Sequence, residues 1–144
     1  MLVAGAISMS HAYSHHSYAQ FDPCTDVTIK GEVRAAEYAN PHIVLEVETV
    51  DGAIYRVEWM SLQALTRSGL EPDVVAVGDY VEITGARHRD PDINVLTMLK
   101  QFDRPSDGWV WSRERQQPVN RGNGACQSTR ARSIIVGFAG SESR

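Results

Sequence analysis

The chain of 144 residues has no run of eighteen apolar residues, which excludes a transmembrane helix within it. It also lacks a surplus of positive charge. Its formal net charge is −4, which argues against a nucleic-acid partner because neutralising phosphates requires a concentrated basic surface. The nucleophile elbow G-x-S-x-G, the zinc motif H-E-x-x-H, a phosphate-binding glycine loop and a dinucleotide-binding fingerprint are all missing. We therefore expect a protein that is not an enzyme.

Cysteine is scarce, and its pattern is simple. Cys24 and Cys126 are far apart in the chain, and no C-x-x-C motif occurs. One disulfide between them would fit an oxidising compartment. Two unpaired thiols are the alternative, because the sequence does not give the distance between the two residues.

The first twelve residues, MLVAGAISMSHA, are typical of the end of a secretory signal. A short apolar run is followed by Ser10-His11-Ala12, which has small residues at the two positions that a signal peptidase recognises. No Lys or Arg precedes the apolar run, so a frayed terminus is the alternative. We predict an exported protein, periplasmic or secreted, in which residues 1–12 are a signal remnant and residues 13–24 form a histidine-bearing N-terminal segment.

Charge divides the rest of the chain. Residues 1–100 hold 7 Lys and Arg against 14 Asp and Glu, giving −7, whereas residues 101–144 hold 7 against 4, giving +3. Apolar residues make up 42% of the sequence, which is ordinary for a globular domain. The asymmetry predicts an acidic domain followed by a basic extension that is solvated or folds back on the domain.

Strands are predicted in one block, residues 25–102. Apolar and polar residues alternate with a period of two, as in half-buried strands, and Asp51-Gly52 is a strong hairpin signal. Gly31 interrupts the first strand, where a glycine marks a bulge or sharp bend that lets one strand serve two sheets. The expected strands are residues 27–37, 43–50, 55–59, 81–85 and 94–102.

A short helix is predicted between the third and fourth strands. Ser61 fits the N-cap, Leu62 and Leu65 share one face, and Gly69 can adopt the left-handed conformation that ends a helix. The order strand, strand, strand, helix, strand, strand is that of the OB-fold. We therefore predict an all-β domain with one short helix, arranged as a five-stranded OB-like Greek-key barrel.

The alternation stops after residue 102. Residues 103–144 are predicted to form a basic, irregular tail that is partly disordered apart from the apolar run Ile134-Ile135-Val136. The tail contains Trp109 and Trp111, which are expected to cover apolar surface.

Several motifs taken together resemble a known family. They are HHSYAQFD at residues 15–22, NPH at 40–42, Trp59 followed by the Ser61-Leu62 helix, and VGDYVEITG at 77–85. The sequence is similar to the DUF6152 family of small exported bacterial proteins over residues 15 to about 100. The resemblance implies a periplasmic OB-like barrel, and it implies no activity because the family has no known function. The tail with Cys126 departs from the family pattern.

The histidines suggest a metal site. Cleavage after Ala12 would place His15 third from the terminus, where the amine, two amide nitrogens and the imidazole form the square-planar array that Cu(II) prefers. His16 and His42 could add ligands, so the predicted copper site comprises Tyr13, Ser14, His15, His16 and His42. The alternatives are a solvated terminus and a turn histidine at His42 whose ring bonds a backbone group. His88, between Arg87 and Arg89, is expected at the surface.

Aromatic residues suggest a second kind of site. OB-fold proteins bind oligomers on the face of their second and third strands, but here that face carries Glu46, Glu48 and Glu58 with Arg56, which disfavours nucleic acid. Stacking on a sugar or other ligand is possible for aromatic rings, although such rings are more often core. The candidates are Tyr55, Trp59, Trp109 and Trp111.

These observations predict a binding module rather than an enzyme. One hypothesis is copper binding at the N-terminal histidines. The other is a small neutral or cationic ligand, a saccharide or a protein partner, bound without metal.

Overall fold

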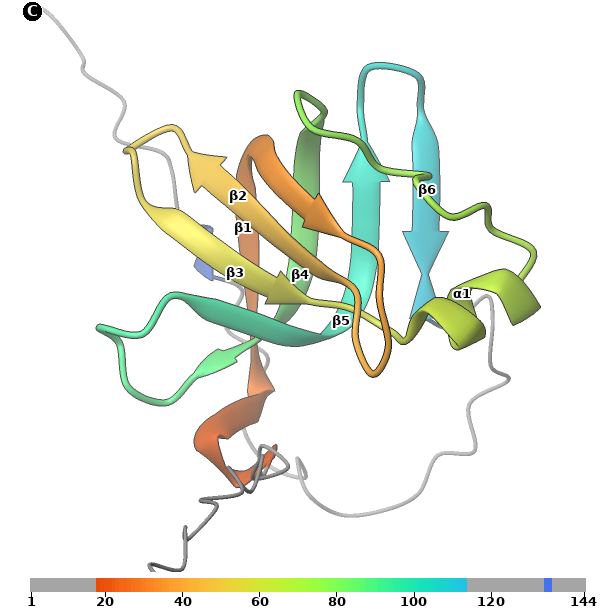
Figure 1. The fold of residues 1–144 in the computed structure, drawn as a ribbon. Helices are drawn as coiled ribbons and strands as arrows, with labels where there is room; N and C mark the ends of the chain where they lie inside the picture. Colours follow the sequence, from red (N-terminus) through yellow and green to blue (C-terminus); the bar gives the residue numbers. More distant parts are fainter. Residues whose placement is uncertain (1–17, 114–133, 136–144) are drawn as a thin grey trace, which may run out of the picture.

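Strands dominate this computed structural model, which describes residues 18–113 and 134–135. A 3-10 turn η1 precedes the first strand, and a six-residue helix α1 separates the third strand from the fourth (Figure 1). No helix in the described ranges has the length and apolar run needed to cross a membrane. The elements are η1 (Tyr18–Gln20), β1 (Phe21–Glu37), β2 (Val44–Thr49), β3 (Ile54–Glu58), α1 (Leu62–Arg67), β4 (Tyr80–His88), β5 (Val95–Arg104), β6 (Trp109–Ser112) and β7 (Ile134–Ile135).

All seven strands belong to one sheet. The antiparallel pairs are β1–β2, β2–β3, β1–β4, β4–β5 and β5–β6, whereas β3–β5 and β1–β7 are parallel. Because β1 pairs with both β2 and β4, and β3 pairs with β5, the hydrogen-bonded neighbours form the closed series β1, β2, β3, β5, β4. The all-β class and the order of the first five strands around a short helix are as predicted.

Strand β1 is long enough to serve two neighbours, as the sequence indicated. Gly31 is opposite Thr49 of β2 and Val81 of β4, so it pairs on both sides. A Cβ added at Gly31 would lie against the backbone of Glu48, 2.7 Å from its carbonyl carbon and 3.0 Å from Thr49 Cα. Only glycine permits this approach of β1 to β2. The register shift itself falls between Val33 and Ala35.

Helix α1 has the predicted ends. The Ala64 N–H donates to Ser61 Oγ at 3.1 Å, which is the N-cap hydrogen bond. Gly69 has a φ of +79°, and the Leu70 N–H donates to the Leu65 carbonyl at 3.3 Å. The cap turns the chain toward the segment before β4.

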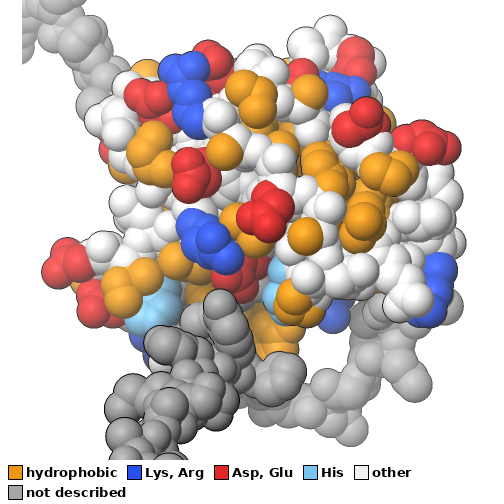
Figure 2. All heavy atoms as spheres, viewed as in Figure 1, with side chains coloured by type: hydrophobic (Ala, Val, Ile, Leu, Met, Phe, Trp, Pro, Cys, Tyr) orange, Lys and Arg blue, Asp and Glu red, His pale blue; other side chains and the backbone are white. Residues whose placement is uncertain are grey.

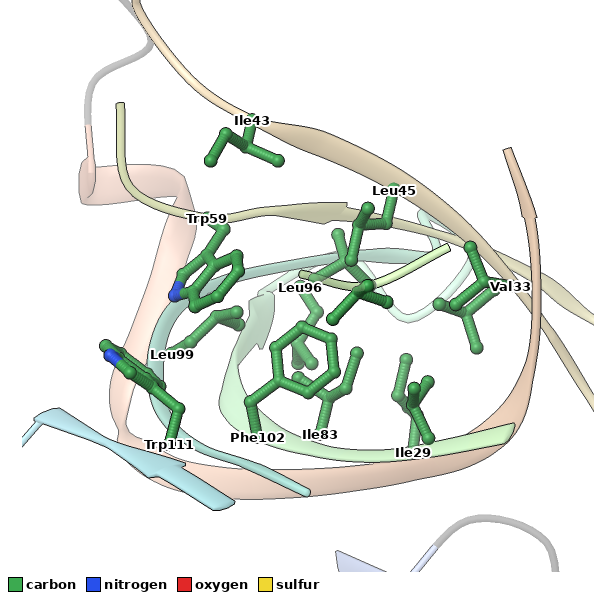
Figure 3. Packing of buried hydrophobic residues seen from close by; sticks show 14 of the residues in the cluster. Ile29, Val33, Ile43, Leu45, Trp59, Ile83, Leu96, Leu99, Phe102 and Trp111 are labelled. Carbon is green, nitrogen blue, oxygen red and sulfur yellow. The ribbon is translucent and has the colours of Figure 1, made fainter. Parts of the chain in front are cut away.

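The core lies inside the strands, and most of its buried residues come from β1, β2, β3, β4 and β5 (Figure 3). Phe102 and Ile83 are completely buried and paired across β4 and β5. Tyr38 closes one edge of the core, because its hydroxyl donates to the Val75 carbonyl at 2.8 Å and accepts from the Val75 N–H at 2.9 Å. Burial raises the pKa of Tyr38 above its ordinary value.

Two expectations are corrected. The chain is regular at Trp109–Ser112, which forms β6 against β5 rather than part of an irregular arm. His88 is not an ordinary surface residue in the loop after the fourth strand. It is the last residue of β4 and half-buried, it packs edge-on against Phe21 with ring centroids 5.5 Å apart, and its Nδ1 accepts from the Asp90 N–H. Because β1 begins as early as Phe21, the Phe21 ring reaches His88 and packs against it.

Of the two cysteines in the predicted disulfide, the structure describes Cys24. Cys24 lies half-buried on β1, and its N–H donates to Asp22 at 3.1 Å. Cys126 lies outside the described residues, so the pairing stays a prediction.

Candidate functional site

A hollow of about 930 Å³ lies beside the aromatic end of the core. Its walls come from η1, the turn before β2, the end of β3, helix α1, the middle of β5 and the end of β6. Tyr18 and Arg113 contribute from the two ends of the main described segment. The hollow brings together residues that are far apart in the sequence, including Trp59 and Trp111.

The tryptophans form a packed cluster. Trp59 follows β3 and is 4% exposed, and Trp111 on β6 is 6% exposed. Their ring centroids are 5.3 Å apart in an edge-to-face arrangement, and Phe102 lies 5.1 Å from Trp59. Trp109 also packs edge-on against Trp59, at 6.4 Å. Trp59 and Trp111 are therefore core residues, which is the alternative that the sequence left open.

The two indole N–H groups at the hollow have no hydrogen-bond acceptor among the described residues. Trp59 Nε1 and Trp111 Nε1 are both buried without a partner. Figure 3 shows both nitrogens turned to the same side of the cluster, away from Phe102. Leaving a buried donor unpaired costs about 1–3 kcal/mol, so two such donors beside one cavity favour an acceptor from outside the described residues.

The hollow is bordered by strained backbone. Met98, a non-glycine residue on β5, has a φ of +48°. The strand bulges here. Ala86 of β4 pairs with Thr97 and Thr84 pairs with Gln101, so three residues of β5 lie opposite Gly85 alone. Gly85 lies under the bulge, where an added Cβ would be 2.7 Å from the Thr97 carbonyl oxygen. Strain of this kind persists where the surroundings fix it, and it is frequent at functional sites.

A set of hydrogen bonds from one arginine, Arg104, holds β6 in position. Arg104 at the end of β5 donates to Asp79 at 2.9 Å, to Asp107 at 2.8 Å and to the Val74 carbonyl at 2.7 Å. Its guanidinium also lies 5.7 Å from the ring centroid of Trp109. The hydrogen bond from Arg104 lowers the pKa of Asp107. These contacts fix the turn that returns Trp111 to the core.

Charge at the hollow is mostly positive. Arg67 and Arg113 are exposed and line it, and neither forms an ion pair within the described part of the chain. Glu58 also lines it, but it is paired with Arg56 at 3.2 Å. Elsewhere the two signs are interspersed, as Figure 2 shows for one face.

The other predicted site residues are dispersed. His42 is exposed at the hollow, with its Nδ1 3.3 Å from the Trp59 carbonyl oxygen, as expected for a turn histidine. Tyr55 lies half-buried on β3 away from the hollow, and burial raises its pKa. No group of three or more His, Cys, Asp or Glu able to hold a metal occurs in residues 18–113 and 134–135. The remaining copper ligands proposed, Tyr13, Ser14, His15 and His16, lie outside the described residues.

Sequence reasoning missed part of this site. Met98 carries no local signal, since no glycine or proline occurs within β5 itself, and nothing in the sequence next to Arg113 indicates a site. The tryptophans were identified as candidates, but for their faces rather than for their N–H groups.

The sequence model of a family described as of unknown function, DUF6152, matches residues 3–97. The chain belongs to the DUF6152 family. The match includes Trp59 and ends before Met98, so the β5 bulge and β6 lie beyond it. The resemblance seen in the sequence motifs is thereby confirmed.

No curated protein matches this DUF6152 chain. One similar solved structure is described as the crystal structure of the ZRD-deleted mutant of TiaS in complex with agmatine, with a TM-score of 0.41 and 15% sequence identity. The likeness covers 55% of this chain and 21% of that one.

Proposed function

We propose that this DUF6152 protein is an exported binding module, and that the hollow beside Trp59 and Trp111 is its ligand site. The observation that carries the proposal is a pair of buried indole donors beside one cavity, for which the described residues offer no acceptor. The strained Met98 in the cavity wall supports it. A small molecule with an acceptor oxygen would complete the hydrogen bonding.

We also propose that the closed series of strands is a five-stranded OB-like barrel. The pairing order β1, β2, β3, β5, β4 and the helix between β3 and β4 support this assignment. The ligand site then lies at one end of the barrel, beside the helix, rather than on the outer face of β2 and β3.

The ligand site is testable by NMR of the indole N–H groups. The chain has three tryptophans, so three indole cross-peaks are expected and can be assigned with single Trp→Phe variants. Three probes of similar shape, phenylacetate, phenylacetamide and 2-phenylethylamine, are added at millimolar concentration. At least one should shift the Trp59 and Trp111 signals downfield, because hydrogen bonding deshields the proton.

Trp109 is the internal control, since its nitrogen is not among the unpaired buried donors. The proposed function is wrong if no probe shifts the Trp59 and Trp111 signals more than that of Trp109. It is also wrong if both signals already have hydrogen-bonded shifts without a probe and do not respond, because the chain itself would then supply the acceptor.

Copper binding is the second candidate, and one observation favours it. Tyr18 and His42 line the same hollow. His16 is two residues from Tyr18, and two residues of extended chain span at most about 7 Å. The length of chain between His16 and Tyr18 therefore allows His16 to approach the hollow.

Cu(II) titration tests this candidate. The protein used is one whose N-terminal residue has been determined from its intact mass. We expect a square-planar visible band near a 1:1 ratio that weakens as pH falls, because amide protons must leave. His15→Ala and a one-residue N-terminal extension should abolish the band, while the control His88→Ala should not. Absence of binding, or a band unaffected by His15→Ala, would contradict it.

A further inference from the structure

The residues that line the hollow also define a ligand class. Trp59 Nε1 and Trp111 Nε1 can only donate hydrogen bonds, so the ligand must present acceptors. An ammonium group would find no partner at these two atoms. The buried end of the site therefore selects against a cationic head group, contrary to one of the ligand classes considered from the sequence.

The charges at the rim extend this selection. Arg67 and Arg113 are exposed at the hollow, without a carboxylate partner among the described residues. Among the described lining residues the one carboxylate is Glu58, which is 15% exposed and paired with Arg56. The chain as a whole has a net charge of −4, so this concentration of unpaired cations is local. Arginine is the residue best suited to bind a carboxylate.

The remaining lining gives the shape of the ligand. Met60, Met98 and Leu99 supply apolar surface, and thioether side chains adapt to ligands of different outline. Trp59 and Trp111 are only 4% and 6% exposed, so a sugar has no open indole face there on which to stack. An apolar body with one anionic end matches these surfaces.

We infer that the hollow binds a small organic carboxylate, with its oxygens at the two indole N–H groups, its charge balanced by Arg67 and Arg113, and its apolar body against the methionines. This inference rests on the proposed function, since it names the ligand class of that same site. Charge-assisted hydrogen bonds are about twice as strong as neutral ones, which is the source of the discrimination.

The same three probes separate the ligand class from the existence of the site. Phenylacetate and phenylacetamide have nearly the same shape and both offer acceptors, whereas 2-phenylethylamine offers none when protonated. From indole shifts measured as a function of concentration, phenylacetate should bind about ten times more tightly than phenylacetamide. The amine should leave the Trp59 and Trp111 signals in place.

Arginine variants test the source of the selectivity. The double variant Arg67→Gln with Arg113→Gln should reduce the preference for phenylacetate over phenylacetamide to about threefold or less, because it removes both positive charges at the rim. The expected change is modest because charges exposed to solvent are screened. Arg34→Gln is the matched control: Arg34 is an exposed arginine on β1 paired with Glu32 and Glu48, outside the hollow. It should retain the full preference.

The outcomes are distinct. Equal binding of the acid and the amide would overturn the carboxylate assignment and leave the binding site standing, as would preferential binding of the amine. A preference for the acid that survives in the double variant would overturn the role of the two arginines. If no probe shifts either indole signal, both the ligand class and the proposed function fail.

Discussion

Replacing Gly31 by alanine is expected to lower the free energy of unfolding by at least about 3 kcal/mol. The added Cβ would meet the backbone of Glu48, 2.7 Å from its carbonyl carbon, and backbone cannot rotate away as a flexible side chain can. Because Gly31 pairs with both β2 and β4, a shift to relieve the contact would disturb two ladders at once. Urea unfolding followed by tryptophan fluorescence measures the loss.

Gly52→Ala is the matched control for this experiment. Gly52 lies in the hairpin between β2 and β3 with a φ of +82°, and no atom lies within 4 Å of an added Cβ. Only conformational strain of about 1–2 kcal/mol is expected there. If Gly31→Ala is no more destabilising than Gly52→Ala, then β1 and β2 are not as close as the structure places them.

Trp59→Ala is expected to destabilise the protein by about 3–5 kcal/mol. The ring is almost completely buried and lies at the centre of the aromatic cluster, 5.1 Å from Phe102 and 5.3 Å from Trp111. Truncation removes these contacts and leaves a cavity that a rigid sheet cannot close. The midpoint of urea unfolding should fall accordingly.

Val110→Ala serves as the comparison, because Val110 is on β6 next to the cluster but 41% exposed. The Val110→Ala substitution should lower the free energy of unfolding by less than about 1 kcal/mol. A near-neutral Trp59→Ala would place the indole at the surface, and would make it a platform for stacking rather than part of the core.

Local patterns in the sequence located the five strands and the helix predicted within residues 25–102, but not residues 21–26 of β1 or the last three residues of β4. Period two located the strands because each has one buried face, and Ser61 and Gly69 marked the helix ends through capping interactions that are local. Strand β6 was missed because Trp109–Ser112 is only four residues long, too short for alternation to be distinguished from chance. Its strand character depends on pairing with β5.

The site was less accessible than the fold. Trp59 and Trp111 could be identified as aromatic candidates, but the direction of their N–H groups depends on packing between segments distant in the sequence. The bulge at Met98 arises from the register of β4 against β5, which no residue type announces. The hollow exists only where these elements meet, so no single stretch of sequence encodes it.

The closed pairing of the strands has a consequence for how the molecule opens. Strand β1 pairs with β4 over residues 21–32 and with β2 over residues 31–37, and the series closes only when β3 pairs in parallel with β5, across the whole α1 and β4 segment. Contacts so distant in sequence make folding slow relative to helical proteins. In a closed series few strands can separate from the sheet alone, because releasing any strand exposes the edges of its two neighbours. Slow amide hydrogen exchange should therefore extend around all five strands at similar free energy, as one cooperative unit.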